Sequence, residues 1–121
     1  MSVVMIVDDS KTVRNYHSSI LKTMGIEIVE AENGMEALEK SLGAKIDLYL
    51  VDVNMPIMDG YSFIRDLRKQ EKHKQVPVIM VTTQAKEEDK LNAYKAGANL
   101  FETKPIKPDQ LQAYIDILVN N

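Results

Sequence analysis

The sequence predicts an α/β protein built on one parallel sheet, in which five strands and five helices alternate along the chain. Short β-branched runs alternate with segments of helical periodicity, and the 121 residues have room for one ordinary domain. Strands that alternate with helices pair in parallel, because each helix crosses back over the sheet in the right-handed sense and covers one of its faces. We therefore expect a single doubly wound (βα)5 domain over residues 1–121.

The predicted elements follow from local patterns. Apolar, β-branched runs bounded by turn residues mark the strands, and apolar residues that recur every three or four positions mark the helices. The predicted strands are residues 3–7, 26–31, 47–51, 76–81 and 100–103. The predicted helices cover residues 10–24, 35–42 and 87–96, together with a segment marked by Tyr61, Ile64, Leu67 and Arg68 and a last one marked by Leu111, Tyr114, Ile115 and Leu118.

Residue types at the ends of these segments support the boundaries. Ser10 is a favoured N-cap, and Gly25 and Gly97 are favoured stops just beyond a helix. Pro77 lies at the start of the fourth strand, where its missing N–H is tolerated. In the first helix, the side chains that we expect to cover the sheet are Val13, Tyr16, Ile20, Leu21 and Met24.

Composition narrows the class of protein. Hydrophobic residues make up 45% and charged residues 27% of the chain, as in globular proteins, and no apolar stretch is long enough to span a membrane. The net charge of -3 is opposite in sign to the basic surface that holds nucleic acid phosphates, so we expect no nucleic acid partner. Cysteine is absent and residues 1–7 lack a basic leader, so we expect a cytoplasmic protein without a signal peptide.

Polar residues suited to phosphoryl chemistry lie at or just past four predicted strand ends. They are Asp8, Asp9, Asp52, Thr82 and Lys104. The carboxyl ends of parallel strands share one edge of the sheet, where open α/β sheets bind their ligands. Closely placed carboxylates repel one another unless a cation offsets their charge, and Mg²⁺ favours a few carboxylates together with water and phosphate oxygens. Because a hydroxyl and an ammonium can hold phosphoryl oxygens, the set predicts a site for a metal and a phosphate.

Five motifs at these positions resemble those of response regulator receiver domains of the stand-alone, CheY-like chemotaxis type. They are IVDDS at 6–10, VDVNMPIMDG at 51–60, MVTTQA at 80–85, AGA at 96–98 and KP at 104–105. Each motif is weak by itself, but five in this order and spacing are specific. The resemblance covers the whole chain and implies a flavodoxin-like, CheY-like parallel sheet with strand order 2-1-3-4-5.

The resemblance implies that Asp52 is the phosphoacceptor. Its carboxylate would attack a phosphohistidine on a partner histidine kinase, or a small acyl phosphate, and form an aspartyl phosphate. By the same resemblance, Asp9 and Asp52 would bind Mg²⁺ directly together with the backbone carbonyl of Asn54, and Asp8 would act mainly through bound water. The ion would neutralise charge and align the phosphoryl group.

The resemblance also implies a switch. Thr82 and Lys104 would bind the phosphoryl oxygens, and Thr82 would move toward the phosphate. Phe101 would turn into the vacated space, at a position where many chemotaxis members carry tyrosine; the missing hydroxyl alters the balance of its two positions, and about 1.4 kcal/mol changes that ratio tenfold. Asn54 and Gln84 would orient the water that removes the phosphate. Because both are neutral amides, we expect slow intrinsic dephosphorylation.

The implied output is protein binding by the surface made of the fourth helix, fifth strand and fifth helix. Candidates on that surface are Tyr94, Lys95, Asn99 and Lys107. Because the sequence leaves no residues over for an output domain, we expect a diffusible messenger rather than an enzyme acting on other substrates. Its expected partners are the kinase, a downstream protein such as a flagellar motor switch component, and a phosphatase, with no membrane partner.

Three alternatives stay open. The first is a receiver in a phosphorelay outside chemotaxis, and the second is a receiver that acts only as a binding scaffold. The third is an Mg²⁺-dependent phosphohydrolase with an Asp nucleophile, which would need a substrate-enclosing lid for which 121 residues leave little room.

The remaining candidates for chemistry have simpler interpretations. His17 and His73 have no partners at metal-ligand spacing, so we expect His17 on a helix surface and His73 in a loop. Met5, Met24 and Met80 fall on apolar positions and are expected in the core. The sequence leaves the isomer of the Lys104–Pro105 bond open.

Overall fold

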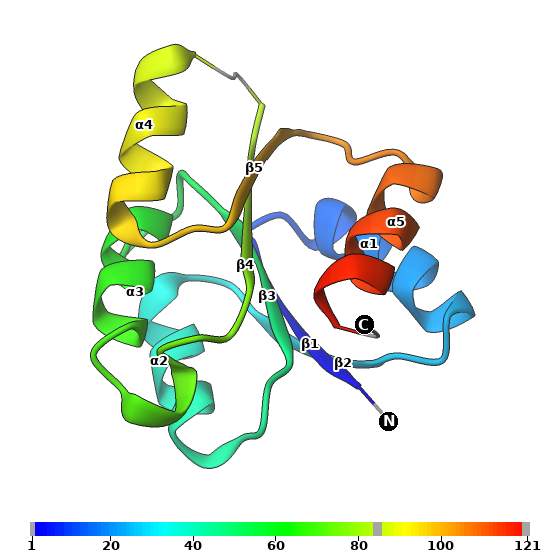
Figure 1. Ribbon diagram of the computed structural model, residues 1–121, viewed down its shortest axis with the longest axis horizontal. Helices are drawn as coiled ribbons and strands as arrows, with labels where there is room; N and C mark the ends of the chain where they lie inside the picture. Colours follow the sequence, from blue (N-terminus) through cyan, green and yellow to red (C-terminus); the bar gives the residue numbers. More distant parts are fainter. Residues whose placement is uncertain (1, 84–85, 120–121) are drawn as a thin grey trace.

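In residues 2–83 and 86–119, which the computed structural model describes, five parallel strands form one sheet with helices on both faces (Figure 1). The strands are β1 (Val3–Val7), β2 (Glu27–Ala31), β3 (Leu48–Asp52), β4 (Val78–Thr82) and β5 (Leu100–Thr103). The helices are α1 (Lys11–Thr23), α2 (Gly34–Gly43), α3 (Gly60–Leu67), α4 (Glu87–Ala96) and α5 (Pro108–Leu118), with a short 3-10 helix η1 (Glu71–His73) before β4. The predicted alternation is therefore confirmed.

The strand order is β2-β1-β3-β4-β5, as the resemblance implied, and every neighbouring pair is parallel. The register aligns the carboxyl ends of the central strands, because Val7 pairs with Val51 and Asp52 pairs with Val81. Thr82 pairs with Thr103 on β5. Residues that follow β1 and β5 therefore meet the last residues of β3 and β4 at one edge.

Two cores pack on the two faces of the sheet. Helices α1 and α5 cover one face, and α2, α3 and α4 cover the other (Figure 1). Alternate residues of β3 enter opposite cores: Leu50 packs with α1 and α5, whereas Tyr49 and Val51 pack with the other three helices. All five residues of β3 are buried, as expected for a central parallel strand covered on both faces.

Side-chain caps and one glycine fix the local boundaries near the carboxyl edge. Ser10 accepts a hydrogen bond from the Val13 N–H at 3.3 Å and begins α1, as the sequence predicts. At the start of α3, a Cβ on Gly60 would lie 2.2 Å from the carbonyl oxygen of Asp52. Only glycine therefore lets α3 begin directly against the end of β3.

The predicted sheet-facing side of α1 is partly wrong. Tyr16 is 36% exposed, and its hydroxyl donates to the Ile106 carbonyl oxygen at 2.9 Å instead of entering the core. The buried side chains of α1 are Arg14, His17, Ser18 and Leu21. Arg14, His17 and Ser18 thus lie on the buried face together with Leu21. Because these three residues are polar, the apolar pattern alone places the buried face of α1 incorrectly.

The expected positions of both histidines, His17 on a helix surface and His73 in a loop, are also wrong. His17 and His73 are each 1% exposed. His73 lies in η1, where its Nδ1 is 3.2 Å from the Tyr49 hydroxyl and its Nε2 is 2.8 Å from the Ser41 carbonyl oxygen. Burial is possible because these partners replace water at both ring nitrogens.

None of the described helices is both long enough and apolar enough to cross a lipid bilayer.

Candidate functional site

The predicted site residues converge at the carboxyl edge of the sheet. Asp8 directly follows β1, Asp52 ends β3, Thr82 ends β4 and Lys104 directly follows β5. β3 and β4 each run one residue further than predicted, so that Asp52 and Thr82 belong to the strands themselves. Asp8, Asp52 and Thr82 are 2%, 6% and 5% exposed, so these three side chains lie at the edge of the core, whereas Asp9 is exposed to solvent.

Lys104 joins the two buried carboxylates. Its Nζ lies 2.8 Å from Asp8 Oδ2 and 3.0 Å from Asp52 Oδ1. Its backbone N–H donates to the Thr82 carbonyl oxygen at 2.7 Å, and the Lys104–Pro105 bond, whose isomer the sequence left open, is cis. Lys104 thus faces the acids from a backbone position tied to the end of β4.

Three acids form a cluster of the size that a metal ion needs. One carboxylate oxygen from each of Asp8, Asp9 and Asp52 lies within 4.8 Å of the other two. Burial, together with the charge of Asp8, raises the pKa of Asp52 from 3.8 to about 6, while Lys104 acts in the opposite direction. The positive charge of Lys104 therefore offsets only part of the repulsion between the carboxylates. Three oxygen ligands of this kind fit a hard divalent cation such as Mg²⁺, which would remove that repulsion.

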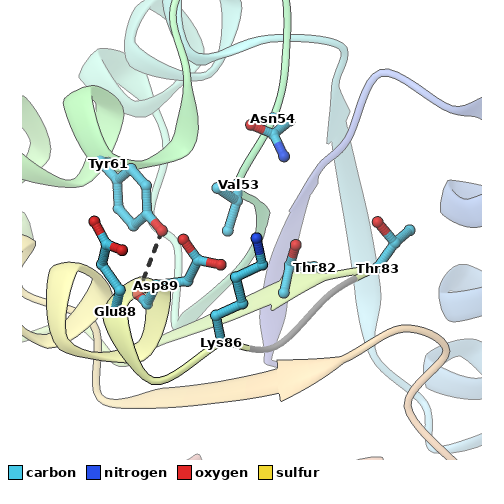
Figure 2. A pocket seen from close by; sticks show the side chains of 8 residues that line it. All are labelled: Val53, Asn54, Tyr61, Thr82, Thr83, Lys86, Glu88 and Asp89. Atoms are coloured by element: carbon cyan, nitrogen blue, oxygen red, sulfur yellow. Dashed lines mark hydrogen bonds between the residues drawn. The ribbon is translucent and has the colours of Figure 1, made fainter.

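A polar hollow of about 250 Å³ lies beside the acid cluster, between the end of β3 and the start of α4 (Figure 2). The residues that line it are Val53, Asn54, Tyr61, Thr82, Thr83, Lys86, Glu88 and Asp89. Figure 2 shows Lys86 extending across the hollow between Asp89 and Thr82, and the Tyr61 hydroxyl donates to the Asp89 carbonyl oxygen at 3.3 Å. Asn54 and Thr82, both predicted from the sequence, thus line a space next to Asp52.

The other predicted residues are placed differently. Phe101 is half-buried on β5, opposite Met80, and packs against the core on the α4 side of the sheet. Gln84 lies outside the described residues. Asn99, a candidate for the binding surface, is exposed but has its side-chain oxygen engaged by the Val78 N–H at 2.8 Å and by Arg68 at 3.0 Å. The hydrogen bond from Val78 to Asn99 holds the segment that leads into β5 against the start of β4.

Arg14 is the site-associated residue that the sequence reasoning missed. Its guanidinium, buried on α1, donates to the Asp8 carbonyl oxygen at 2.7 Å and to Glu30 on β2 at 2.9 Å. A usable signal was present: Arg14 stands three and seven residues before His17 and Leu21, on the face that is buried.

The open parallel sheet and the acids, hydroxyl and lysine at its carboxyl edge define a class of protein, the doubly wound domain with a site suited to a cation and a phosphoryl group. Comparison with known families makes the class specific. The family model for the response regulator receiver domain matches residues 4–116, and the chain belongs to this family. The resemblance drawn from the five motifs is therefore confirmed.

Curated relatives include chemotaxis proteins. The chain is 34% identical over 118 residues to the chemotaxis protein CheY1 of Helicobacter pylori, which covers 96% of this chain and 95% of that protein. It is 39% identical over 115 residues to the sensor histidine kinase CheAY of the same species, covering 93% of this chain but spanning 14% of the kinase's length. Similarity at this level thus occurs both in a protein of about this length and in one segment of a much larger kinase.

Solved structures give the same fold. The chemotaxis protein CheY4 of Vibrio cholerae superposes with a TM-score of 0.92 at 35% identity, covering 98% of this chain and 99% of that one. The receiver domain of the sensor histidine kinase PA1611 of Pseudomonas aeruginosa has a TM-score of 0.92 at 28% identity, covering 99% and 98%, and contains a magnesium ion coordinated in its active site cleft. The CheY-like architecture of this chain is therefore established.

Proposed function

We propose that this receiver domain is phosphorylated on Asp52 by a partner histidine kinase and transmits the signal by binding another protein. The observation that carries the proposal is the position of the Asp52 carboxylate, which ends the central strand 3.0 Å from Lys104 Nζ and within the cluster formed with Asp8 and Asp9. The adjacent hollow, lined by Asn54 and other polar residues, offers space beside this nucleophile.

The proposed transfer uses Asp52 as nucleophile. A carboxylate oxygen bonds to phosphorus as the bond between phosphorus and the donor histidine nitrogen breaks, and the imidazole leaves with the bonding electron pair. Lys104, which now pairs with Asp8 and Asp52, has three N–H donors and can direct one to a transferred oxygen. The Thr82 hydroxyl is a further donor at the same edge. Both groups would act where negative charge is spread during phosphoryl transfer.

A divalent cation fits the donors of this edge. Asp9 and Asp52 would hold Mg²⁺ directly with the backbone carbonyl of Asn54, and Asp8 would act mainly through a bound water. When bound, the ion would offset the charge of the acids and of the phosphoryl group. The pKa of Asp52 is raised to about 6 by burial and by the charge of Asp8, and it supports this assignment because a cation would offset the repulsion between the two acids.

The proposed switch connects Thr82 to Phe101. Thr82 would move toward the phosphate, and Phe101 would turn into the vacated space. Phe101 is half-buried on β5, two residues before Thr103, which pairs with Thr82. The surface formed by α4, β5 and α5 would then change its affinity for a partner. Asn54, at the rim of the hollow, and Gln84 would orient the water that removes the phosphate slowly.

We assign the pathway to chemotaxis, with a flagellar motor switch component as target and a phosphatase as a further partner, in the cytoplasm. The near-full-length similarity to CheY1 of Helicobacter pylori and CheY4 of Vibrio cholerae supports this assignment. The protein would catalyse only its own phosphorylation and dephosphorylation. A phosphohydrolase, by contrast, would turn over many phosphate esters.

Intact-mass measurement after incubation with acetyl phosphate and Mg²⁺ tests the central proposal. We expect wild-type protein to gain one phosphoryl group and Asp52→Asn to gain none. Asp47→Asn is the matched control, because Asp47 lies at the opposite edge of the sheet, where its carboxylate accepts from the Val3 N–H at 2.8 Å. Absence of the gain in wild type, or an equal gain in Asp52→Asn, would contradict phosphorylation at Asp52.

The target is tested with the phosphorylated protein. Binding to a purified flagellar motor switch component should be stronger with phosphorylated wild type than with Asp52→Asn under the same conditions. Equal binding of the two proteins would contradict the proposed chemotaxis target, but it would not affect the conclusion on phosphorylation at Asp52.

A further inference from the structure

Arg14 makes contacts that tie helix α1 to the acidic edge. Its Nη1 donates to the Asp8 carbonyl oxygen at 2.7 Å, and its Nε donates to Glu30 Oε1 at 2.9 Å. Its Nη2 lies 3.8 Å from Glu32. The Arg14 side chain is 9% exposed, whereas those of Glu30 and Glu32 are 42% and 66% exposed. The guanidinium is thus buried at its Asp8 end and held by carboxylates from the solvent side.

The carbonyl that Arg14 holds belongs to the peptide unit joining Asp8 to Asp9. Because a peptide unit is planar, fixing this oxygen also fixes the directions in which the chain leaves toward both acids. Two further bonds act on the same residue: the Asp8 N–H donates to the Ala31 carbonyl oxygen at 3.0 Å, and Asp8 Oδ1 accepts from the Ser10 N–H at 2.9 Å. Asp8 Oδ2 is then left facing Lys104.

We propose that Arg14 is a positioning residue for the cation site: by holding the Asp8 carbonyl, it sets the Asp8 and Asp9 carboxylates for metal binding without touching the ion. This inference rests on the proposed function. The Glu30 ion pair has a separate role, since it orients the guanidinium from the exposed side. Outer partners that orient the ligands of a metal site commonly contribute ten- to hundredfold in metal affinity.

Removal of Arg14 should act on the metal site before it acts on the fold. Arg14→Met keeps an unbranched side chain of similar reach but removes every donor, and it leaves the buried Asp8 carbonyl without its partner. We expect the dissociation constant for Mg²⁺ to rise about tenfold or more. Arg14→Lys retains one charged donor and should recover part of the affinity, because an ammonium cannot span Asp8 and Glu30 as the guanidinium fork does.

Arg68 provides a matched control in the same chain. It is also a partly buried arginine bonded to backbone carbonyls, donating to Gly97 at 2.8 Å and to Val76 at 2.6 Å, but these carbonyls lie outside the acidic edge. Arg68→Met should lower stability while leaving the Mg²⁺ dissociation constant within about twofold of wild type. Glu30→Gln, which keeps a neutral acceptor for Arg14 Nε, should behave in the same way toward Mg²⁺.

The test is a titration of MgCl2 into ¹⁵N-labelled protein, followed through the amide signals of Asp9 and Ser10, with the free energy of unfolding measured for each variant. In metal-free protein, Arg14→Met should also shift the Ser10 amide signal and speed its hydrogen exchange, whereas Arg68→Met should leave both unchanged. These readouts do not depend on phosphorylation.

Wild-type Mg²⁺ affinity in Arg14→Met would overturn the inference. Equal losses of affinity in Arg14→Met and Arg68→Met would overturn it too, because they would indicate general loosening. If Arg14→Met does not fold, Arg14→Lys decides: undiminished affinity overturns the inference, and an intermediate loss supports it. A loss of Mg²⁺ affinity in the variants, combined with no phosphoryl gain by wild type, would sustain the inference while rejecting the proposed function.

Discussion

Two buried polar regions lie near opposite edges of the same sheet and differ in how their groups are compensated. Near the amino end of β4, each ring nitrogen of His73 has a partner of its own, the Tyr49 hydroxyl for Nδ1 and the Ser41 carbonyl oxygen for Nε2. At the carboxyl edge, Asp8 and Asp52 share the single ammonium of Lys104. Fully hydrogen-bonded polar groups make a core rigid. Like charges held close together repel one another, and a bound cation would offset that repulsion.

Arg68 extends the paired region. Its guanidinium donates to carbonyl oxygens of Gly97, Val76 and His73, at 2.6 to 2.9 Å for the shortest bond to each. These bonds hold the loops that lead into β4 and β5. The comparison predicts that substitutions in the paired region lower stability, whereas neutralising an acid at the carboxyl edge raises it.

The largest expected effect is that of His73→Ala. It removes a ring that is 1% exposed, together with its contacts to the Tyr49 hydroxyl and the Ser41 carbonyl oxygen. We expect the free energy of unfolding in urea to fall by about 3 kcal/mol, from the cavity and the lost hydrogen bonds together. Glu71→Ala, in the same short helix but with a side chain 93% exposed, should change it by less than about 0.5 kcal/mol. Equal effects would mean that the histidine network contributes nothing specific.

The next effect has the opposite sign. Burial and the charge of Asp8 raise the pKa of Asp52 from 3.8 to about 6. Because the folded state holds this proton more tightly than the unfolded state, wild type loses stability as the pH rises from about 4 to about 6, and the loss persists above that range. Metal-free Asp52→Asn should therefore be more stable than wild type by about 2 to 3 kcal/mol near pH 8.

Urea unfolding in chelator at about pH 4 and pH 8 checks this sign. The stabilisation by Asp52→Asn should vanish at the lower pH, where Asp52 is protonated in the folded wild type. Asp66→Asn, whose side chain is 42% exposed in a surface ion pair with Lys69, is the control and should change stability by less than about 1 kcal/mol at either pH. A gain that is equal at both pH values would exclude charge repulsion as its cause.

The smallest effect concerns strain in the loop that follows β3. Ile57 has φ of 70° and is 80% exposed, and the Met58 N–H donates to the Pro56 carbonyl oxygen at 2.7 Å around it. A β-branched residue is strained in this three-residue turn, whereas glycine is not. Ile57→Gly should raise the free energy of unfolding by about 1 kcal/mol.

Ile57→Val is the control for this turn, because valine keeps the β-branch and should give no gain. Thermal unfolding of the three proteins at one pH measures the difference. A loss of stability in Ile57→Gly would indicate that glycine's greater freedom in the unfolded chain outweighs the strain that it relieves.

Local signals in the sequence were sufficient for most of the carboxyl edge. β-branched runs located the strands, and the polar residue at the end of each run located Asp8, Asp52 and Thr82, because parallel strands end at a common edge. Ser10 capped α1 as predicted, since an N-cap depends on a hydrogen bond only three residues away.

The misplaced residues depend on distant partners. His73 is buried because Tyr49 and Ser41, 24 and 32 residues away in the chain, meet its two ring nitrogens. Arg14 is buried because the Asp8 carbonyl and Glu30 meet its guanidinium, and its inward position moves Tyr16 toward the surface. Helical spacing from Leu21 could have placed Arg14 on the buried face of α1, but no local pattern reports which distant groups become the partners of Arg14 or His73.

The sequence by itself determined the βα alternation, the strand ends and the acids, hydroxyl and lysine that stand there, because strand and helix periodicities and caps are short-range properties. Only the tertiary structure decided that Lys104 divides its charge between Asp8 and Asp52, that Arg14 holds the peptide between the two adjacent acids, and that His73 is buried. These outcomes depend on which polar groups meet when water is excluded, because burying a polar group costs free energy unless a partner, here from a distant part of the chain, replaces that water.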